Sequence, residues 1–314
     1  MKQPVRIMGI VNLTGDSFYP PSRMLGADGR LDRALFLGRC RQMASEGASF
    51  LDLGACSTRP GSEPVSEAEE WDRLSPALEA LREEAPELLP RLSVDTFRGG
   101  IVRRVFDTVG PVLVNDISLG QLDADMLPAV SALGLPYVAM HMRGTPATMD
   151  SLCDYGGDVV GAVHAYFEGF AELADAMGIR EWILDPGLGF AKTPEQCLEL
   201  LVHLPAFADL GRPILIGLSR KRLVRAVSEG LPLPASAYGA NASAADVSGT
   251  DVSGADVSGA NASAAGVSGA GVSGANASAA DAVDIAMARL HRLAVAGGAS
   301  ILRVHDVAAA RACL

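Results

Sequence analysis

Eight short apolar runs recur along the chain, and most of them end in a polar residue of a type that takes part in catalysis. Parallel strands that are buried on both faces read as continuous apolar runs of this kind. The pattern therefore predicts a buried parallel sheet with polar side chains collected at the strand ends. The runs cover 5–13, 50–55, 91–95, 112–116, 137–143, 182–187, 213–221 and 301–306.

Helical patterns separate these runs. Repeated strand–helix units imply a parallel sheet, and eight of them favour a closed (β/α)8 TIM barrel, which typically needs ~250 residues. A doubly wound sheet is disfavoured because no G-x-G-x-x-G follows the first run. We therefore expect one α/β barrel domain over 1–314. The expected helices cover 31–47, 66–85 with a capping box at Ser66, 97–108, 123–134, 158–178, 193–211 with a Thr193 cap, 219–230 and 281–298.

A low-complexity insertion, 240–279, lies between the seventh and eighth expected strands. It divides into eight pentapeptides of the form Ala/Thr-Asp/Asn/Gly-Val/Ala-Ser-Gly/Ala. Such units resemble the repeats of quadrilateral β-helix proteins, but solenoids need several coils to bury a core. The favoured interpretation is a flexible surface loop, because long surface insertions reduce stability little.

The chain is acidic, with a formal net charge of -11. Nucleic-acid binding would need a basic stripe, so no nucleic-acid partner is expected, whereas local cations could still hold a small anion. The five cysteines have no zinc-binding spacing and are typical of a reducing compartment. The first strand starts about four residues in, which leaves no room for a signal peptide. No run of about 18 apolar residues predicts a membrane span, so we expect a cytoplasmic protein.

Taken together, the strand ends resemble one family, the dihydropteroate synthases of folate biosynthesis. The resemblance implies a transferase in which 4-aminobenzoate displaces pyrophosphate from 6-hydroxymethyl-7,8-dihydropterin diphosphate, giving 7,8-dihydropteroate. It also implies a sulfonamide target. The matching stretches lie in order from residue 8 to 307: MGIVNLTGDSF (8–18), GACSTRPGSEPVS (54–66), SVDTF (93–97), NDIS (115–118), MHMRGTPATM (140–149), ILDPGLGFAKTPEQ (183–196), GLSRK (217–221) and ILRVHDV (301–307).

A pterin presents ring N–H and amino donors beside a carbonyl. A buried carboxylate can accept two donors from its guanidine-like edge, and Asp185 is the expected partner, with Asp95 and Asn115 beside it. Lys221 can donate to the carbonyl. Each aspartate alone would more simply cap the helix that follows. Four such residues at strand ends of one barrel favour pterin binding instead.

A diphosphate leaving group needs cations, and Arg303 and His305 alternate along the last strand, so both point to one side of it. Arg59 could reach in from a loop. Asn12 offers an oxygen ligand for Mg2+, the one cofactor expected. Taken alone, His305 would be interpreted as a structural histidine bonded to Asp306 or to a backbone carbonyl, but Arg303 beside it favours diphosphate binding.

The expected chemistry is SN1-like, because pterin ring electrons can stabilise a developing cation as pyrophosphate leaves. Charge neutralisation of the leaving group and positioning of the amine do most of the work. The resemblance places 4-aminobenzoate against loops and the start of the helix at 219–230. The residues expected to bind it are Phe18, Thr58, Pro60, Phe190, Ser219 and Arg222.

Several positions carry less information or depart from the family. His141 and Arg143 belong to a family motif, but the sequence assigns them no chemistry. Cys56 stands where Glu is common and is interpreted as a small buried thiol. A homodimer is expected, although the chain after the last strand is short for the closing helix that takes part in family dimer packing.

Two other functions compete with the synthase. A methyltetrahydrofolate–corrinoid methyltransferase would share the Asp and Asn pterin contacts but has no use for diphosphate cations. The second alternative is a weakly catalytic paralogue in which the repeat arm is a binding module. The intact set of polar strand ends argues against both.

Overall fold

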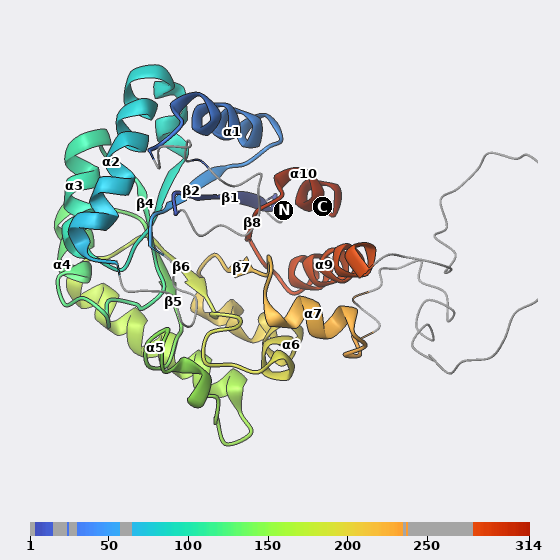
Figure 1. The fold of residues 1–314 in the computed structure, drawn as a ribbon. Coiled ribbons are helices and arrows are strands. Elements are labelled where there is room, and N and C mark those ends of the chain that lie inside the picture. The colour runs from blue at the N-terminus through green and yellow to red at the C-terminus, as the bar shows by residue number, and fades with distance from the viewer. Residues whose placement is uncertain (1–3, 15–23, 25–29, 57–64, 235–236, 238–278) are drawn as a thin grey trace, which may run out of the picture.

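The computed structural model describes residues 4–14, 24, 30–56, 65–234, 237 and 279–314 (Figure 1). Four residues with predicted roles lie outside this part of the chain: Phe18, Thr58, Arg59 and Pro60. The repeat block also lies outside it, apart from Ala279, which begins a helix. The interpretations of these segments therefore stay predictions.

Eight parallel strands form the centre of the molecule, as the apolar runs predicted. They follow one another in space in chain order, and β8 lies between β1 and β7. A parallel bridge between Leu184 and Ile214, with Leu184 N–H donating to Pro213 O at 2.9 Å, closes the ring between β6 and β7. The strands are β1 (Arg6–Asn12), β2 (Phe50–Gly54), β3 (Leu92–Asp95), β4 (Leu113–Asp116), β5 (Tyr137–Met140), β6 (Trp182–Asp185), β7 (Leu215–Gly217) and β8 (Ile301–Val304).

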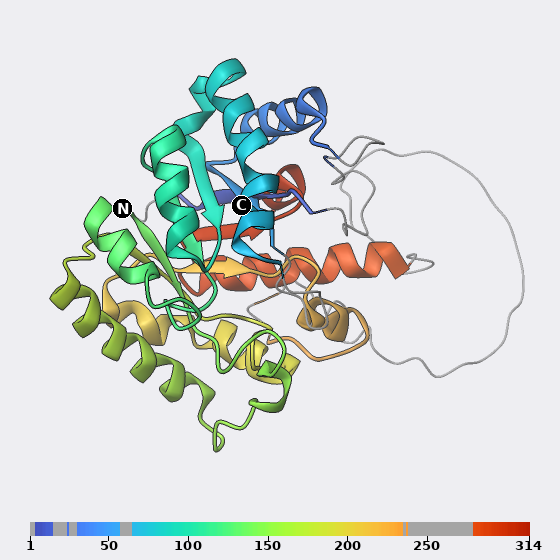
Figure 2. The same cartoon turned by 60° about the vertical axis from the view of Figure 1, so that its left-hand side comes forward.

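Helices surround the ring of strands, which makes the fold the predicted (β/α)8 barrel (Figures 1 and 2). The expected capping box at Ser66 is present, with Ser66 N–H donating to Glu69 at 2.8 Å. None of the described helices is both long and apolar enough to span a membrane. The helices are α1 (Arg33–Ser45), α2 (Glu67–Glu84), α3 (Gly99–Val109), α4 (Met126–Leu133), α5 (Val159–Met177), α6 (Pro194–Val202), α7 (Arg222–Ser228), α9 (Ala279–Ala296) and α10 (Val307–Ala312).

One expected helix is divided. The helix predicted over 193–211 ends as α6 at Val202, and a separate 3-10 helix, η4 (Leu204–Leu210), follows it. Pro205 has no N–H to continue the hydrogen-bond ladder toward residue 201, so the α-helical pattern stops before it. The expected Thr193 cap is present, and Gln196 completes a capping box with it.

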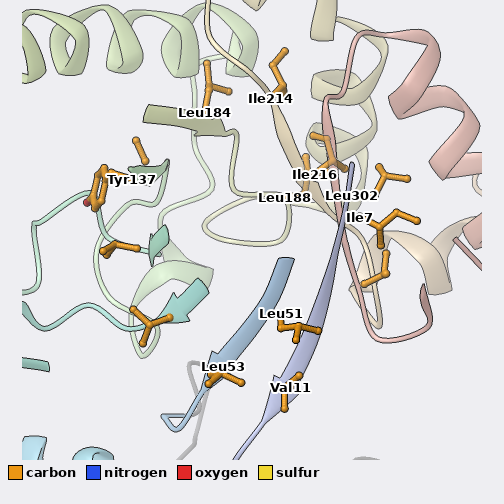
Figure 3. Close-up of a cluster of buried hydrophobic side chains, with 14 of the residues drawn as sticks. Ile7, Val11, Leu51, Leu53, Tyr137, Leu184, Leu188, Ile214, Ile216 and Leu302 are labelled. Carbon is orange, nitrogen blue, oxygen red and sulfur yellow. The ribbon is translucent and has the colours of Figure 1, made fainter. Parts of the chain in front are cut away.

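Alternate residues of each strand point to opposite sides of the barrel wall. Outward side chains pack under the helices in the main apolar core, and Ile7, Leu51, Leu184 and Leu302 are examples of it (Figure 3). Inward side chains form a second, smaller apolar cluster that fills the barrel interior. Its members are Met8, Leu113, Val138, Ile183, Leu215 and Ile301, with Phe50 packed against them.

A polar layer lies directly above this interior cluster, toward the C-terminal strand ends. Because side chains alternate along a strand, the residue two positions after an inward apolar residue also points inward. Asp52 follows Phe50 in this way, and Arg303 follows Ile301. Asn115 likewise follows Leu113, and Asp185 follows Ile183. The barrel thus changes from apolar to charged within one layer, at the face where TIM barrels carry active sites.

Candidate active site

A buried carboxylate, Asp52 on β2, is the hub of the polar layer. Its side chain is fully buried. Its Oδ1 accepts the Ser93 hydroxyl at 2.6 Å, while its Oδ2 accepts Asn115 Nδ2 at 3.0 Å and Arg303 Nε at 2.7 Å. Because Asn115 donates its amide nitrogen to Asp52, its amide oxygen is oriented away from Asp52 and is available as an acceptor. Asp52 therefore joins β2, β3, β4 and β8 at one level of the barrel.

Arg303 connects this hub to Asp95. Its Nη2 donates to Asp95 Oδ2 at 2.5 Å, and the two carboxylates keep the pKa of the guanidinium above its ordinary value. The side chains of Arg303 and Asp95 are 22% and 18% exposed, so solvent or a ligand can reach both. Burial raises the pKa of Asp95 to about 7, the neighbouring carboxylates add to the rise, and the Arg303 charge opposes it.

Asp185 and Lys221 carry opposite charges at the ends of β6 and β7. Asp185 is 5% exposed and accepts Gly187 N–H at 2.8 Å. Burial raises the pKa of Asp185, whereas the Lys221 charge lowers it. Burial also lowers the pKa of Lys221, and Asp185 opposes that shift. Gly217, the last residue of β7, lies between the side chains of Lys221 and Arg303: a Cβ on Gly217 would be 3.6 Å from Lys221 Nζ and 3.9 Å from Arg303 Cβ.

The ends of β7 and β8 are tied together next to this pair. His305 N–H donates to Ser219 Oγ at 3.3 Å. Arg39 on α1 donates to the His305 carbonyl at 2.9 Å. Asp306 caps α10 by accepting Ala309 N–H at 2.8 Å, so its carboxylate is used in capping. β8 ends at Val304, so the alternation of the strand points Arg303 inward but does not extend to His305, whose shared side stays a prediction.

An apolar wall borders the charged groups. Phe190 packs against a small buried cluster formed by Ile117, Met140, Met142, Met149 and Ala191. Lys221 Nζ lies 5.0 Å from the centre of the Phe190 ring, a cation–π contact. The wall and the charged groups together offer a flat apolar surface beside hydrogen-bonding side chains.

Arg222 has a partner, Asp150, which directly follows Met149 of this wall. Its Nη2 donates to Asp150 at 2.6 Å, and both side chains are about half exposed. Helix α7 begins at Arg222, and Lys221 occupies its N-cap position without a side-chain capping bond. Exposed pairs of this kind are weak, so Arg222 can exchange Asp150 for another anion at low cost.

His141 and Lys192 form a buried pair behind the wall. Lys192 is fully buried, and its Nζ lies 2.7 Å from His141 Nδ1. Burial and the charges of Lys192 and Arg143 lower the pKa of His141 to about 2, so the imidazole is neutral and Nδ1 accepts. Arg143 donates to the Asp154 carbonyl at 2.6 Å and stacks on Tyr155.

Two polar residues of the family motifs have structural roles. Asp116 points outward from β4 and accepts the Tyr137 hydroxyl at 2.6 Å and Gly120 N–H at 2.6 Å, so it organises the turn after the strand. Cys56 is half-buried, and burial raises the pKa of its thiol. A raised pKa disfavours the thiolate form that a nucleophile needs.

The structure brings six predicted residues to one mouth of the barrel, and Asn12 ends β1 beside Gly54 at the same face. The described residues contain no group of three or more His, Cys, Asp or Glu side chains suited to a metal ion. Sequence reasoning missed Asp52 and Lys192. The first could have been found as a lone carboxylate inside the apolar run FLDLG. The six residues that converge are Asp95, Asn115, Asp185, Lys221, Arg303 and Phe190.

Comparison with known proteins agrees with this arrangement. The pattern of the pterin binding enzyme family matches residues 8–258. The dihydropteroate synthase of Synechocystis is 39% identical over 220 residues, which cover 69% of this chain and 72% of that protein. A mitochondrial folate synthesis bifunctional protein of Arabidopsis thaliana is 39% identical over 232 residues, but the match spans only 40% of its length. The Thermus thermophilus dihydropteroate synthase in complex with 4-aminobenzoate has a TM-score of 0.69 at 33% identity, covering 98% of this chain and 91% of that one.

Proposed function

The chain belongs to the pterin-binding enzymes, among the dihydropteroate synthases, and from this premise we propose how its residues carry the reaction. The enzyme is a transferase of folate biosynthesis that condenses 6-hydroxymethyl-7,8-dihydropterin diphosphate with 4-aminobenzoate, releasing pyrophosphate. The curated relatives at 39% identity are named for this activity or for folate synthesis, which disfavours the methyltransferase alternative.

One observation carries the proposal: acceptors and cations meet in a single layer at the C-terminal mouth of the barrel. Asp95, Asn115 and Asp185 supply the acceptors, and Lys221 and Arg303 supply the cations. All five come from different strands or strand ends. A ligand that presents several donors beside a negatively charged tail matches such a layer.

Pterin recognition would use the acceptors. Asp185 is the carboxylate for the guanidine-like edge of the ring, because it is buried and still faces the interior. Asn115 would add its amide oxygen, whose direction is fixed by the donation of its nitrogen to Asp52. Lys221 would donate to the pterin carbonyl. Asp95 would accept a further donor in exchange for part of its contact with Arg303.

The leaving group would be held at the end of β8. Arg303 lies on the inner side of that strand, His305 follows the strand end and is proposed to reach the same group, and Ser219 Oγ lies against the His305 backbone. Arg303 stays charged because its pKa is raised. Asp52 fixes its Nε, so Arg303 presents a guanidinium of fixed orientation to the diphosphate. Arg59 is proposed as a third cation from its loop.

Asn12 would hold a Mg2+ ion together with the diphosphate oxygens and water. Mg2+ keeps several waters and is commonly bound by one or two protein oxygens plus substrate phosphates. A single amide oxygen at the end of β1 fits an ion that arrives with its substrate. When bound, the ion would supply additional positive charge to the leaving pyrophosphate.

Bond formation would be SN1-like. The C–O bond to the diphosphate weakens while the electron-rich pterin stabilises positive charge at the methylene carbon, and the arylamine then adds to that carbon and loses a proton. No side chain needs to act as a nucleophile, in keeping with the raised pKa of Cys56. The protein contributes mainly charge stabilisation and positioning.

The 4-aminobenzoate site is proposed beside the apolar wall. The Phe190 ring borders Lys221, which marks the pterin end of the site. Ser219 and Arg222 lie on the same β7–α7 connection, where Arg222 could exchange Asp150 for the substrate carboxylate. Phe18, Thr58 and Pro60 are proposed to complete the site from two loops. Sulfonamides would compete for it.

The test is to identify the product. Purified protein is incubated with the pterin diphosphate and isotopically labelled 4-aminobenzoate, and 7,8-dihydropteroate is measured by mass spectrometry. We expect formation by the unaltered chain and a loss of at least ~100-fold in Asp185→Asn, because a carboxylate acceptor becomes a donor. An active Asp185→Asn variant would contradict the pterin assignment. The homodimer and the cytoplasmic location stay predictions, and native mass spectrometry checks the first.

A further inference from the structure

A lysine that the reaction does not use directly is enclosed behind the site. Lys192 follows β6 at the end of the β6–α6 connection and has no exposed surface. Its Nζ donates to the carbonyls of Phe190 at 3.0 Å and Gly187 at 3.2 Å and lies 2.7 Å from His141 Nδ1. A buried ammonium is costly unless it is fully hydrogen-bonded, and here four acceptors surround it, the fourth being the His141 carbonyl oxygen at 3.4 Å.

The connection that Lys192 closes is compact and packed against β5. Gly187 and Ala191 both have left-handed backbone conformations, with φ of +68° and +50°. A Cβ on Gly187 would lie 1.9 Å from the His141 carbonyl oxygen. Gly189 N–H donates to Cys197 Sγ at 3.1 Å, which anchors the middle of the segment to α6. The loop 187–192 is therefore held from both sides, with the Lys192 ammonium inside its turn.

The outer side of this loop borders the site. The Leu188 carbonyl accepts Lys221 Nζ at 2.5 Å, and the Phe190 ring lies 5.0 Å from the same nitrogen. Lys192 donates hydrogen bonds to the carbonyls of Gly187, which precedes Leu188, and of Phe190 itself. The position of the two groups that contact Lys221 thus depends on the hydrogen bonds of Lys192.

We propose that Lys192 is a positioning residue: with neutral His141 as its partner, it folds the loop 187–192 around its ammonium group and so sets the direction in which Lys221 and the Phe190 ring face the substrates. This inference rests on the proposed function of Lys221 and Phe190. It gives the MHMRG and GFAK motifs one shared role, although they lie about 50 residues apart in sequence.

The physical advantage is rigidity. A cation in the turn bonds to acceptors that would otherwise require water in an apolar surrounding. Burial lowers the pKa of Lys192 to about 7, with Lys221 and Arg143 adding to the decrease and Cys197 and Asp185 opposing it. The ammonium form offers three donors to the four acceptors, whereas the neutral amine offers two, so the loop is held most firmly below this pKa.

The chain offers a direct measurement, because it contains only three lysines: Lys2, Lys192 and Lys221. Protein labelled with 13C at lysine Cε should give three signals, assigned with Lys192→Met and Lys221→Met. We expect the Lys192 signal to titrate far below the ordinary lysine range of about 10.4. A Lys192 signal that titrates in the ordinary range would contradict the enclosure of the ammonium, which is the premise of the inference.

The functional test compares Lys192→Met with Arg180→Met. Arg180 is exposed and precedes β6, whereas the loop 187–192 follows it, so this substitution removes a cation near the other end of β6 without touching the loop. Lys192→Met should shift the Lys221 signal and raise KM for both substrates about tenfold or more, with a smaller decrease in kcat, because misplacement of binding groups is costly. Arg180→Met should change neither.

A second pair covers the case in which Lys192→Met does not fold. His141→Leu removes the imidazole acceptor and keeps the three carbonyl acceptors, and His164→Leu, at an ion pair on α5, is its control. We expect His141→Leu to shift both lysine signals and raise KM, whereas the control does not. Unchanged Lys221 signals and KM values in folded Lys192→Met or His141→Leu, in a protein whose unaltered form is active, would refute the positioning role. An inactive unaltered protein would refute the proposed function instead.

Discussion

At the scale of single residues, the site depends on a carboxylate that faces no substrate. Asp52 is fully buried, yet it orients Asn115 and Arg303, two residues of the proposed substrate site. A residue of this kind contributes to binding through the direction of its neighbours, in the way that supporting shells orient the ligands of metal sites. Its substitution should therefore affect the binding of the pterin more than that of 4-aminobenzoate.

Asp52→Asn tests this role. It removes the charge that pairs with Arg303 Nε, and breaking a buried pair is strongly destabilising. We expect a loss of about 3 kcal/mol in the free energy of unfolding, measured by urea denaturation, and a pterin KM raised by at least ~10-fold. Asp209→Asn is the control, because its exposed pair with His164 should contribute less than about 1 kcal/mol. Equal changes in unfolding free energy and in pterin KM for the two substitutions would contradict the proposed role of Asp52 in orienting Asn115 and Arg303.

The ionisation of Asp95 predicts a pH dependence. Its pKa is raised to about 7 by burial and by the charges of Asp52, Glu70 and Asp116, while Arg303 opposes the rise. The native state therefore binds more protons than the unfolded state between about pH 4 and 7, so this group lowers stability as pH rises through that window. Pterin affinity should change in the opposite direction, increasing with pH as the carboxylate forms.

Calorimetric titration of a pterin ligand between about pH 5.5 and 8.5 measures this effect. The midpoint of the rise in pterin affinity with pH should move to lower pH in Asp52→Asn, because one of the charges that raise the pKa of Asp95 is removed. In Asp95→Asn the pterin affinity should show no such rise. An unchanged midpoint in Asp52→Asn would mean that a group other than Asp95 controls the pH dependence of the affinity.

At the scale of elements, the β6–α6 loop is the part of the site whose backbone is most constrained. Gly187→Ala places a Cβ 1.9 Å from the His141 carbonyl and also requires a left-handed alanine. Gly178→Ala at the end of α5 requires the same backbone, with φ of +73°, but meets no atom within 4 Å. The comparison separates backbone strain, about 1 kcal/mol, from collision with β5.

We expect Gly178→Ala to lower the thermal midpoint slightly and leave activity intact. Gly187→Ala should destabilise by clearly more than about 1 kcal/mol and reduce kcat/KM by at least ~10-fold. Calorimetry and steady-state kinetics measure the two effects. Similar behaviour of both variants would show that the loop tolerates movement and would weaken its proposed role.

Elements were predictable where one period dominated the sequence. The apolar runs and helical spacings gave all eight strands, and the cap signals at Ser66 and Thr193 were confirmed. Lys192 was missed because a lysine in a loop is usually exposed, and because one of its partners, His141, follows a different strand, β5. The pairing of Arg303 with Asp52 and Asp95 was missed for the same reason: alternation predicts the side of a strand but not the partner across the barrel.

At the scale of the whole molecule, the barrel and the repeat block can be tested separately. The described part of the chain contains the whole polar layer, and helices α7 and α9 flank the segment that carries the repeats. Replacing 240–279 by a short Gly/Ser linker should leave kcat and KM within about twofold and change stability by less than ~1 kcal/mol, since loop closure depends weakly on length. A folded deletion variant that has lost activity would show that the repeats are needed for catalysis.

The most direct test of the central claim is pyrophosphate release from 6-hydroxymethyl-7,8-dihydropterin diphosphate. It is measured with and without 4-aminobenzoate and with and without Mg2+. We expect release that requires both 4-aminobenzoate and Mg2+ and that falls by at least ~100-fold in Lys221→Ala, in which a cation that faces the polar layer is lost. No release from a folded protein that still binds the pterin would contradict the synthase assignment.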